Sequence, residues 1–199
     1  MGIVTTGFSM SLDGFVALPN NEIGPLFDWY SIGDTQVEVL AGDGAYKLSS
    51  ESAEMLQEAG KETGVLLTGR RLFDQTNAWG GRHPLNVPIV VVTHSTDGVA
   101  PEWLQEDSIF TFVTGGIESA MAKAQEIAGE KKVAIASTNV LQQCIRAGWL
   151  DEAHIDLVPV LLGEGIRMFD HLGPTQINLE NTSATSFAGV LHLTYRVVK

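Results

Sequence analysis

Three short polar stretches follow apolar runs, and together they could bind an anionic ligand. They are residues 68–71 (TGRR), 93–95 (THS) and 136–139 (ASTN). If each apolar run is a parallel strand, the three stretches meet at the carboxyl edge of one sheet, where open α/β sheets bind ligands. Two of them open helices, whose free N–H groups and dipole attract anions. With the arginine pair, the pattern favours a ligand that carries several phosphates.

The stretch from 133 to 169 predicts the strand–helix–strand unit around which the rest is built. An apolar strand is expected over residues 133–136. The polar residues after it open a helix with one apolar face, and Gly148 ends that helix, with Trp149 packing back over the last turn. A second strand is expected over residues 152–162. Such a unit places a helix N-terminus at the carboxyl end of a strand.

The remaining pattern predicts alternating strands and helices followed by a hairpin. The segment from Pro19 to Ser49 loses its periodicity and is expected to be a long loop that forms a lid or substrate wall; alternatively, its aromatic residues plug the edge of the core. The expected strands cover residues 3–10, 65–68, 88–93, 110–114, 176–187 and 190–198, and the expected helices cover 50–61, 69–73 and 117–128. This order predicts an α/β fold with a mixed, mostly parallel sheet, helices on both faces and a C-terminal antiparallel hairpin, in one domain over 1–199.

Composition narrows the class of protein. Of the 199 residues, 44% are apolar and 18% charged, which is typical of a globular chain. The net charge of −12 argues against nucleic-acid and anionic-membrane partners, which need clusters of Lys and Arg. No run is long enough to span a membrane, and the N-terminus shows no cleavage signal. The lone cysteine, Cys144, is expected to be buried and inert. A cytoplasmic protein is the expectation.

Several common sites are disfavoured. The chain has neither the GxGxxG nor the GxxxxGK[ST] fingerprint, and it lacks the GxSxG nucleophile elbow. Its five histidines do not pair with metal-ligand spacing on one element, so no metal site is expected. His154 and His192 are expected on strands, in the core or on a sheet face. Asp13 precedes a glycine and is expected to cap a turn rather than act in catalysis.

Six blocks in order resemble the dihydrofolate reductase-like superfamily. They are SLDGFVA, LLTGRRLFD, VPIVVVTH, FVTGGIESA, the long block NVLQQCIRAGWLDEAHIDLVPVLLGEGIRMF and LHLTYRVV. The branch that they resemble is related to the reductase domain of the bifunctional deaminase-reductases of riboflavin biosynthesis. The resemblance covers nearly the whole chain and is weakest over residues 19–49. It implies a three-layer fold and an NADPH-dependent reductase of a small heterocyclic or carbonyl-type substrate, assembled as a homodimer.

The resemblance also implies positions for the cofactor. Gly69, Arg70, Arg71 and Leu72 would meet the pyrophosphate and 2′-phosphate, and Thr93, His94 and Ser95 would flank the adenosine. Gly116 and Ile117 would lie near the adenine, and Ser9, Val16 and Ala17 would border the nicotinamide. Ser137, Thr138, Asn139 and Val140 would take the pyrophosphate at the helix N-terminus. For the proton donor, the resemblance leaves only Asp28 and Glu38 as candidates.

The chain departs from the family pattern at Ala136-Ser137, where a Gly-Gly pair is typical. Glycines there permit an unusual backbone and a close approach of the cofactor. Either the turn is rebuilt here, with Ser137 supplying a hydroxyl, or the cofactor fits less well. The alternative function is therefore a non-enzymatic small-ligand-binding homologue that has lost the cofactor turn. A deazaflavin-like or other phosphate-bearing cofactor is a third reading, which the Arg70-Arg71 pair disfavours.

Overall fold

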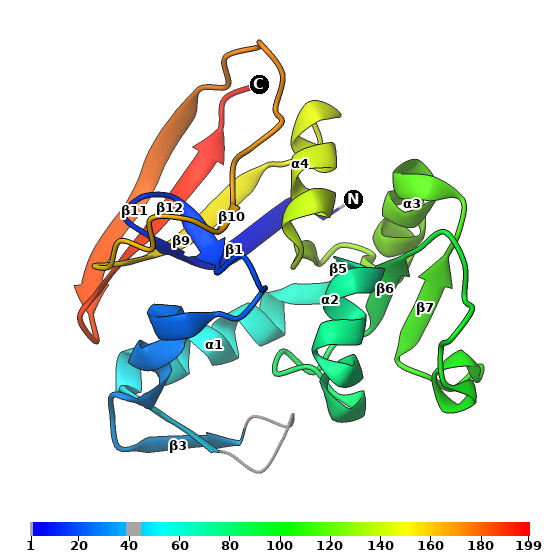
Figure 1. Cartoon of the computed structure of the whole chain (residues 1–199), viewed down its shortest axis with the longest axis horizontal. Helices are drawn as coiled ribbons and strands as arrows, with labels where there is room; N and C mark the ends of the chain where they lie inside the picture. The colour runs from blue at the N-terminus through cyan, green and yellow to red at the C-terminus, as the bar shows by residue number, and fades with distance from the viewer. Residues whose placement is uncertain (1, 39–44) are drawn as a thin grey trace.

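A large mixed sheet forms the centre of the molecule. The computed structural model describes residues 2–38 and 45–199. The strands of the sheet are β1 (Val4–Ser11), β5 (Thr63–Gly69), β6 (Ile89–Val92), β7 (Phe110–Val113), β8 (Lys132–Ile135), β9 (Glu152–Val158), β11 (Leu179–Phe187) and β12 (Val190–Val197). They lie in the order β11-β12-β9-β1-β8-β5-β6-β7 (Figure 1). The six strands from β9 to β7 are parallel, and β12 and β11 add an antiparallel hairpin. The predicted fold class is confirmed.

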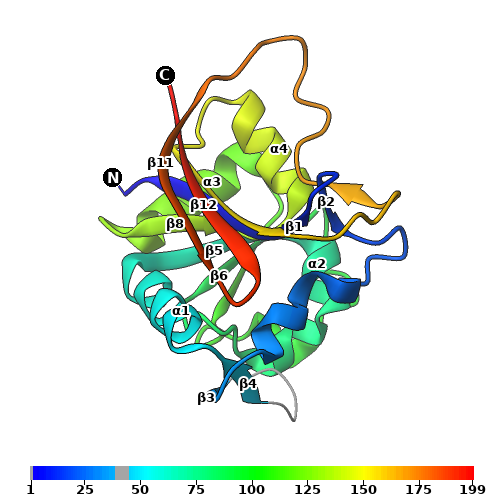
Figure 2. The same ribbon diagram turned by 90° about the vertical axis from the view of Figure 1, so that its left-hand side faces the viewer.

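Helices cover both faces of this sheet. The α-helices are α1 (Ser50–Glu62), α2 (Arg70–Gln75), α3 (Gly116–Ala128) and α4 (Thr138–Arg146), and the 3-10 helices are η1 (Gly24–Ser31), η2 (Asn77–Gly81) and η3 (Pro101–Leu104). In Figure 2, α3 and α4 lie above the strands, and α1 and η1 lie below them. Alternate residues of β5 point to opposite faces of the sheet. Leu67 packs in the core cluster with α3 and α4, and Leu66 packs in the cluster with α2.

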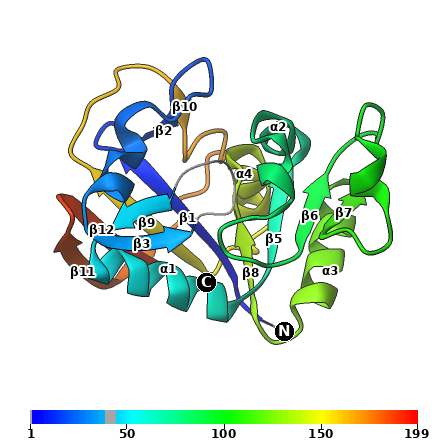
Figure 3. The same ribbon diagram turned by 90° about the horizontal axis from the view of Figure 1, so that it is seen from below.

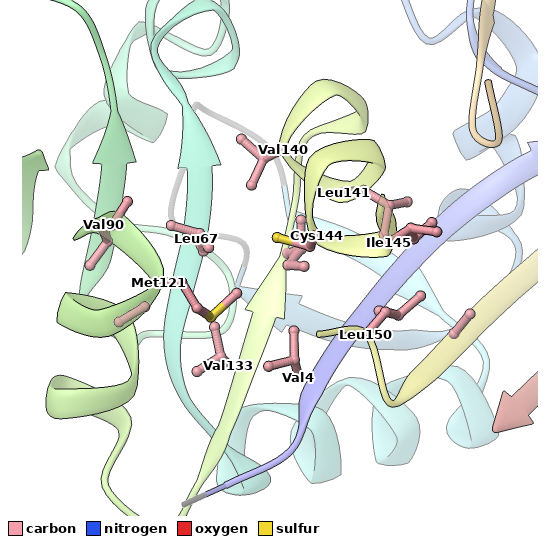
Figure 4. Close-up of a cluster of buried hydrophobic side chains, with 14 of the residues drawn as sticks. Val4, Leu67, Val90, Met121, Val133, Val140, Leu141, Cys144, Ile145 and Leu150 are labelled. Atoms are coloured by element: carbon pink, nitrogen blue, oxygen red, sulfur yellow. The ribbon is translucent and has the colours of Figure 1, made fainter. Parts of the chain in front are cut away.

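The core under α3 and α4 fixes the position of α4. Figure 4 shows Leu141, Cys144 and Ile145 of α4 directed at Val4 and Leu67 on the strands. Leu141 and Cys144 are fully buried, and burial raises the pKa of the Cys144 thiol to about 12. The prediction that Cys144 is buried is confirmed. Because this apolar face is seated on the sheet, the N-terminus of α4 is held at the carboxyl edge.

The C-terminal end of α4 also follows the prediction. Gly148 has a φ of +71°, the left-handed region that glycine enters without the Cβ penalty. Its N–H donates to Ile145 O at 3.0 Å, and the Trp149 N–H donates to Cys144 O at 3.0 Å. Trp149 packs against the core cluster beneath the helix. These bonds stop the helix and direct the chain into β9.

Two of the predicted boundaries were wrong. The strand expected over 152–162 ends at Val158, because Pro159 has no N–H for a ladder. Beyond it the chain turns toward the β1–β2 connection, where the Leu12 N–H donates to Val160 O at 2.9 Å. β2 (Phe15–Ala17) pairs there with β10 (Ile166–Arg167). The last hairpin also starts later than predicted, since β11 begins at Leu179 rather than at residue 176.

The segment from 19 to 49 was expected to lack regular structure, and this was also wrong. It contains η1 and a hairpin of β3 (Thr35–Glu38) and β4 (Ala45–Leu48). Figure 3 shows this hairpin beside α1. Leu26 and Trp29 of η1 are buried against Val158 and Val190. The burial of Trp29 agrees with the alternative expectation that aromatic residues of this segment fill the edge of the core. Among the described residues, no helix is long and apolar enough to cross a membrane.

Candidate functional site

Two of the three polar junctions touch directly. The Ser137 hydroxyl accepts a hydrogen bond from the Gly69 N–H at 3.0 Å. This bond ties the residue before α4 to the last residue of β5, so the starts of α2 and α4 lie side by side. A Cβ on Gly69 would meet Ser137 Oγ at 3.4 Å and Val140 Cγ2 at 3.7 Å, so the approach is close but not strained.

The N-terminal turn of α4 has neither a side-chain cap nor an acidic residue. Ser137 is the N-cap residue, but its hydroxyl is turned to Gly69 instead of to the helix. By contrast, the start of α1 is capped by Ser49 and carries Glu51. In a chain with a net charge of −12, a helix start that is free of acids and leaves its N–H groups uncapped is available to an anion. The six-residue α2 begins beside it, also without a side-chain cap or an acid in its first turn.

Arg70 joins the third junction to the other two. Its guanidinium donates to Ser95 O at 3.1 Å and to Asp97 O at 3.0 Å, and its Nε donates to Asp74 at 2.8 Å. All three of its nitrogens therefore bind protein acceptors. Arg70 positions the loop after β6, whereas its neighbour Arg71 is exposed and donates a hydrogen bond to the Asn21 side chain. Of the predicted pair, Arg71 is the cation that a ligand could reach.

The other residues named by the resemblance lie along the same edge. Thr93 is buried and accepts from the Ser95 N–H, and His94 is exposed. Gly116 opens α3 with a φ of +82°, and no atom lies within 4 Å of where its Cβ would be. Four of the named side chains pack in the core: Val16 and Val140 are buried, and Leu72 and Ile117 are half-buried. The two buried residues offer mainly their main chain to a ligand.

The turn from β1 into β2 is fixed by Asp13. Its carboxylate accepts from Ser11 Oγ at 2.6 Å, from the Leu162 N–H at 3.2 Å and from the Gly163 N–H at 2.8 Å. The hydrogen bond from Ser11 is the main reason that the pKa of Asp13 falls to about 2. The predicted turn-capping role is confirmed. The turn carries the chain into the buried Ala17 and so shapes the end of β1.

The departure at Ala136-Ser137 has a direct structural consequence. Ser137 is extended (φ −124°, ψ 139°), and the described residues contain no cis peptide bond. The Ala136 N–H donates to Leu67 O at 3.0 Å, and the Ser137 hydroxyl accepts from Gly69. Ser137 therefore supplies a hydroxyl at this turn, which binds the facing strand and keeps its own hydrogen free to donate.

Of the two proton-donor candidates, one is exposed and the other has a side chain outside the described part. Asp28 is exposed on η1. Glu38 ends β3, and its side chain lies outside the described residues. Trp29 of η1 makes a hydrogen bond to the sheet, in which its indole N–H donates to Ser9 Oγ at 3.0 Å.

A hydrogen bond between a histidine and an aspartate beside Ser9 was not predicted from the sequence. His192 on β12 is 7% exposed, and its Nδ1 lies 2.7 Å from Asp156 Oδ1 on β9. Its ring stacks on Phe187 and meets the edge of Trp29. The expectation that His154 and His192 lie on strands is confirmed. The alternation of His154 with Asp156 was a signal that both face the same side. No group of three or more metal-ligating side chains occurs among the residues described.

Comparison with known proteins gave one family and a set of similar structures. A family model, the RibD C-terminal domain, matches residues 3–193. A comparison with curated proteins found no match. A protein from Shewanella sp. PV-4 assigned to riboflavin biosynthesis superposes with a TM-score of 0.74 at 18% identity, covering 99% of each chain.

Two further structures have the same fold. The riboflavin biosynthesis reductase Rib7 of Saccharomyces cerevisiae gives a TM-score of 0.62 at 13% identity, covering 99% of this chain and 90% of its own. Dihydrofolate reductase from Enterococcus faecalis, in a complex with NADP(H), gives 0.60 at 15% identity, covering 100% and 98%. At these identities the structures show a shared fold alone, and the family model over residues 3–193 is what bears out the predicted resemblance.

Proposed function

The chain belongs to the RibD C-terminal domain family, and from this premise we propose that it is an NADPH-dependent oxidoreductase that reduces a small heterocyclic or carbonyl-type substrate. The observation that carries the proposal is the acid-free, uncapped start of α4, held against Gly69 by Ser137. The diphosphate of a dinucleotide is an anion, and its oxygens can accept hydrogen bonds from the free N–H groups of this helix start. The NADP(H) named in the Enterococcus faecalis structure supports the same choice.

The residues of this edge fit such a cofactor. The N–H groups of Thr138, Asn139 and Val140 would hold the diphosphate, with the Ser137 hydroxyl as a further donor. Arg71 is exposed and would pair with the 2′-phosphate, while Arg70 holds the loop that carries Ser95. When bound, the cofactor would supply a hydride; the chain would orient it and, through Trp29 and η1, keep water from Ser9.

A titration with NADPH tests this proposal. Nicotinamide fluorescence and thermal unfolding should both change with the cofactor, because a ligand that binds only the folded state stabilises it. NADH, which lacks the 2′-phosphate, should bind more weakly, and Arg71→Met should narrow the difference between the two. If millimolar NADPH leaves both signals unchanged, the proposal is wrong.

The second candidate is a non-enzymatic small-ligand-binding homologue, and the replacement at Ala136-Ser137 favours it. The double variant Ala136→Gly, Ser137→Gly decides between the two. Our proposal expects this variant to bind NADPH no better than the natural chain, because it loses the hydroxyl that binds Gly69. If affinity appears only in the double-glycine variant, the non-enzymatic candidate is correct. The remaining parts of the proposal are a single domain over 1–199, a homodimer and a cytoplasmic location.

A further inference from the structure

Two rows of small and polar residues cross the antiparallel end of the sheet on one face. The first row runs over β11, β12, β9 and β1 as Thr185, His192, Asp156 and Ser9, each paired with the next. The opposite face of the same strands carries Ile155 and other members of the main core cluster.

The second row lies two residues along each strand, so it faces the same side. It consists of Ser183, Thr194, His154 and Gly7, again in direct register. His154 Nδ1 lies 3.2 Å from Thr194 Oγ1. The polar rows (residues 7, 9, 154, 156, 183, 185, 192 and 194) therefore form one continuous surface, and its inner corner is Ser9.

A pocket of about 250 Å³ lies over the outer part of the polar rows. Its floor includes His154, Asp156 and Thr185, and its wall on α1 is made by Glu51 and Met55. The polar rows are therefore not a fully solvent-exposed sheet face, because α1 covers part of them. A volume of this size admits a molecule the size of a monosaccharide but little more.

Several groups in the pocket have no partner of their own within the described residues. Asp156 uses only Oδ1 for His192, which leaves its second oxygen to accept. The hydroxyls of Ser183 and Thr185 make no side-chain hydrogen bond to a described residue and can both donate and accept. Such convergent polar groups around an apolar side chain, here Met55, are the usual make-up of a small-molecule site.

The charge of the lining limits the ligand. Two carboxylates, Glu51 and Asp156, line the pocket together with hydroxyls, and no Lys or Arg is among the lining residues. Burial is the first cause that lowers the pKa of His154, so its imidazole is neutral at pH 7 and provides no cation. The nearby Lys132 is outside the lining and pairs with Glu62 and Glu152. A phosphate in this pocket would therefore face the two carboxylates with no lining Lys or Arg to pair with, whereas an amine or a hydroxyl would find acceptors.

We propose that this pocket binds a polyhydroxylated or amino-bearing group that is uncharged or cationic, and that it rejects a phosphorylated one. The assignment of this group to the substrate rests on the proposed function, because Asp156 is the register partner of Ser9 beside the expected nicotinamide position. The Thermotoga maritima protein in the same structural comparison is named for a phosphoribosylamino-uracil substrate.

The test uses two probes that differ by one phosphate, D-glucosamine and D-glucosamine 6-phosphate. Each is titrated into the ¹⁵N-labelled full chain without NADPH, up to about 50 mM, since a fragment of this size binds weakly. We expect glucosamine to shift the amides of residues 154–156 and 183–185. The 6-phosphate should bind at least about tenfold more weakly, as like charges in one site repel.

Two lysine variants provide the matched controls. Thr185→Lys places a cation in the pocket, and Ser186→Lys places the same charge on the next residue, which is also exposed and faces the other side of the strand. The preference should reverse toward the 6-phosphate in Thr185→Lys and stay unchanged in Ser186→Lys.

Equal binding of the two probes, no shift with glucosamine, or shifts confined to other amides would each overturn the inference. Because the titration needs no NADPH, a failure of NADPH binding would remove the proposed function while leaving this result readable by itself.

Discussion

The substitution Asn139→Asp separates helix stability from cofactor binding at the start of α4. Asn139 Oδ1 accepts from Gln143 Nε2 at 2.7 Å, and an aspartate keeps this acceptor with the same shape. The change adds one negative charge to a first turn that has none. A carboxylate at a helix N-terminus stabilises by about 0.3–1 kcal/mol, which corresponds to a Tm increase of about 1–4 °C for a chain of this length.

The same charge should weaken NADPH. A diphosphate about 6 Å from the new carboxylate would lose about 1–3 kcal/mol per charge pair for an effective dielectric constant between about 20 and 80. That loss corresponds to an increase in Kd of about 5- to 100-fold. The two phosphates each add to the repulsion. Because salt screens this repulsion, the upper part of the range of Kd increase is expected at low salt and the lower part at high salt.

The assay combines thermal unfolding with a fluorescence titration of NADPH on the same samples. Ser50→Asp is the control, since it adds the same charge to the first turn of another helix, α1, which is already capped by Ser49 and carries Glu51. The control should leave the Kd within about twofold, because an exposed charge on that other helix is screened by salt. A stabilised Asn139→Asp variant with an unchanged Kd would refute the reasoning. The added charge would then stabilise the helix, but bound NADPH would not lie near the start of α4.

Three further outcomes are expected from the structure. Cys144 should not react with a thiol reagent at pH 8 until the protein unfolds, because its pKa is raised to about 12; rapid native-state labelling would contradict its burial. Leu141→Ala should lower the free energy of unfolding by about 2–5 kcal/mol in urea titrations, since the side chain is fully buried; a loss below about 1 kcal/mol would contradict the packing. Asp13→Asn should destabilise at pH 7 but hardly at pH 2: the depressed pKa of Asp13 adds stability that is complete above about pH 4 and fades as the pH falls toward 2. Equal destabilisation at both pH values would contradict the hydrogen bonds to that carboxylate.

The sequence was most informative where local chemistry decides the structure. The helix from Thr138 to Arg146 could be predicted because its apolar face and its terminal Gly148 are both local signals. The three junctions could be placed on one edge because parallel strands share a direction. Their actual connection, through Ser137 to Gly69 and through Arg70 to Ser95, is made by side chains far apart in the sequence, so no local pattern contains it.

Contacts between residues far apart in the sequence also explain why the end of β9, the structure of segment 19–49 and the pairing of His192 with Asp156 were not predicted. Pro159 marked the true end of β9, but the apolar residues after it continued the strand pattern. In the segment from 19 to 49, glycines and prolines hid a 3-10 helix that is held by the tertiary contacts of Trp29 rather than by helical periodicity. The pairing of His192 with Asp156 depends on the register between β12 and β9, which the sequence alone does not specify.

The central claim is that the start of α4, tied to Gly69, receives the diphosphate of NADPH. Backbone amide chemical shifts of the labelled chain during a titration with NADP⁺ test it most directly. We expect the largest shifts on residues 69–71 and 138–140, and we expect inorganic pyrophosphate to shift the second group in the same direction. If NADP⁺ binds but its largest shifts lie elsewhere, with these amides unmoved, the account of this site is contradicted.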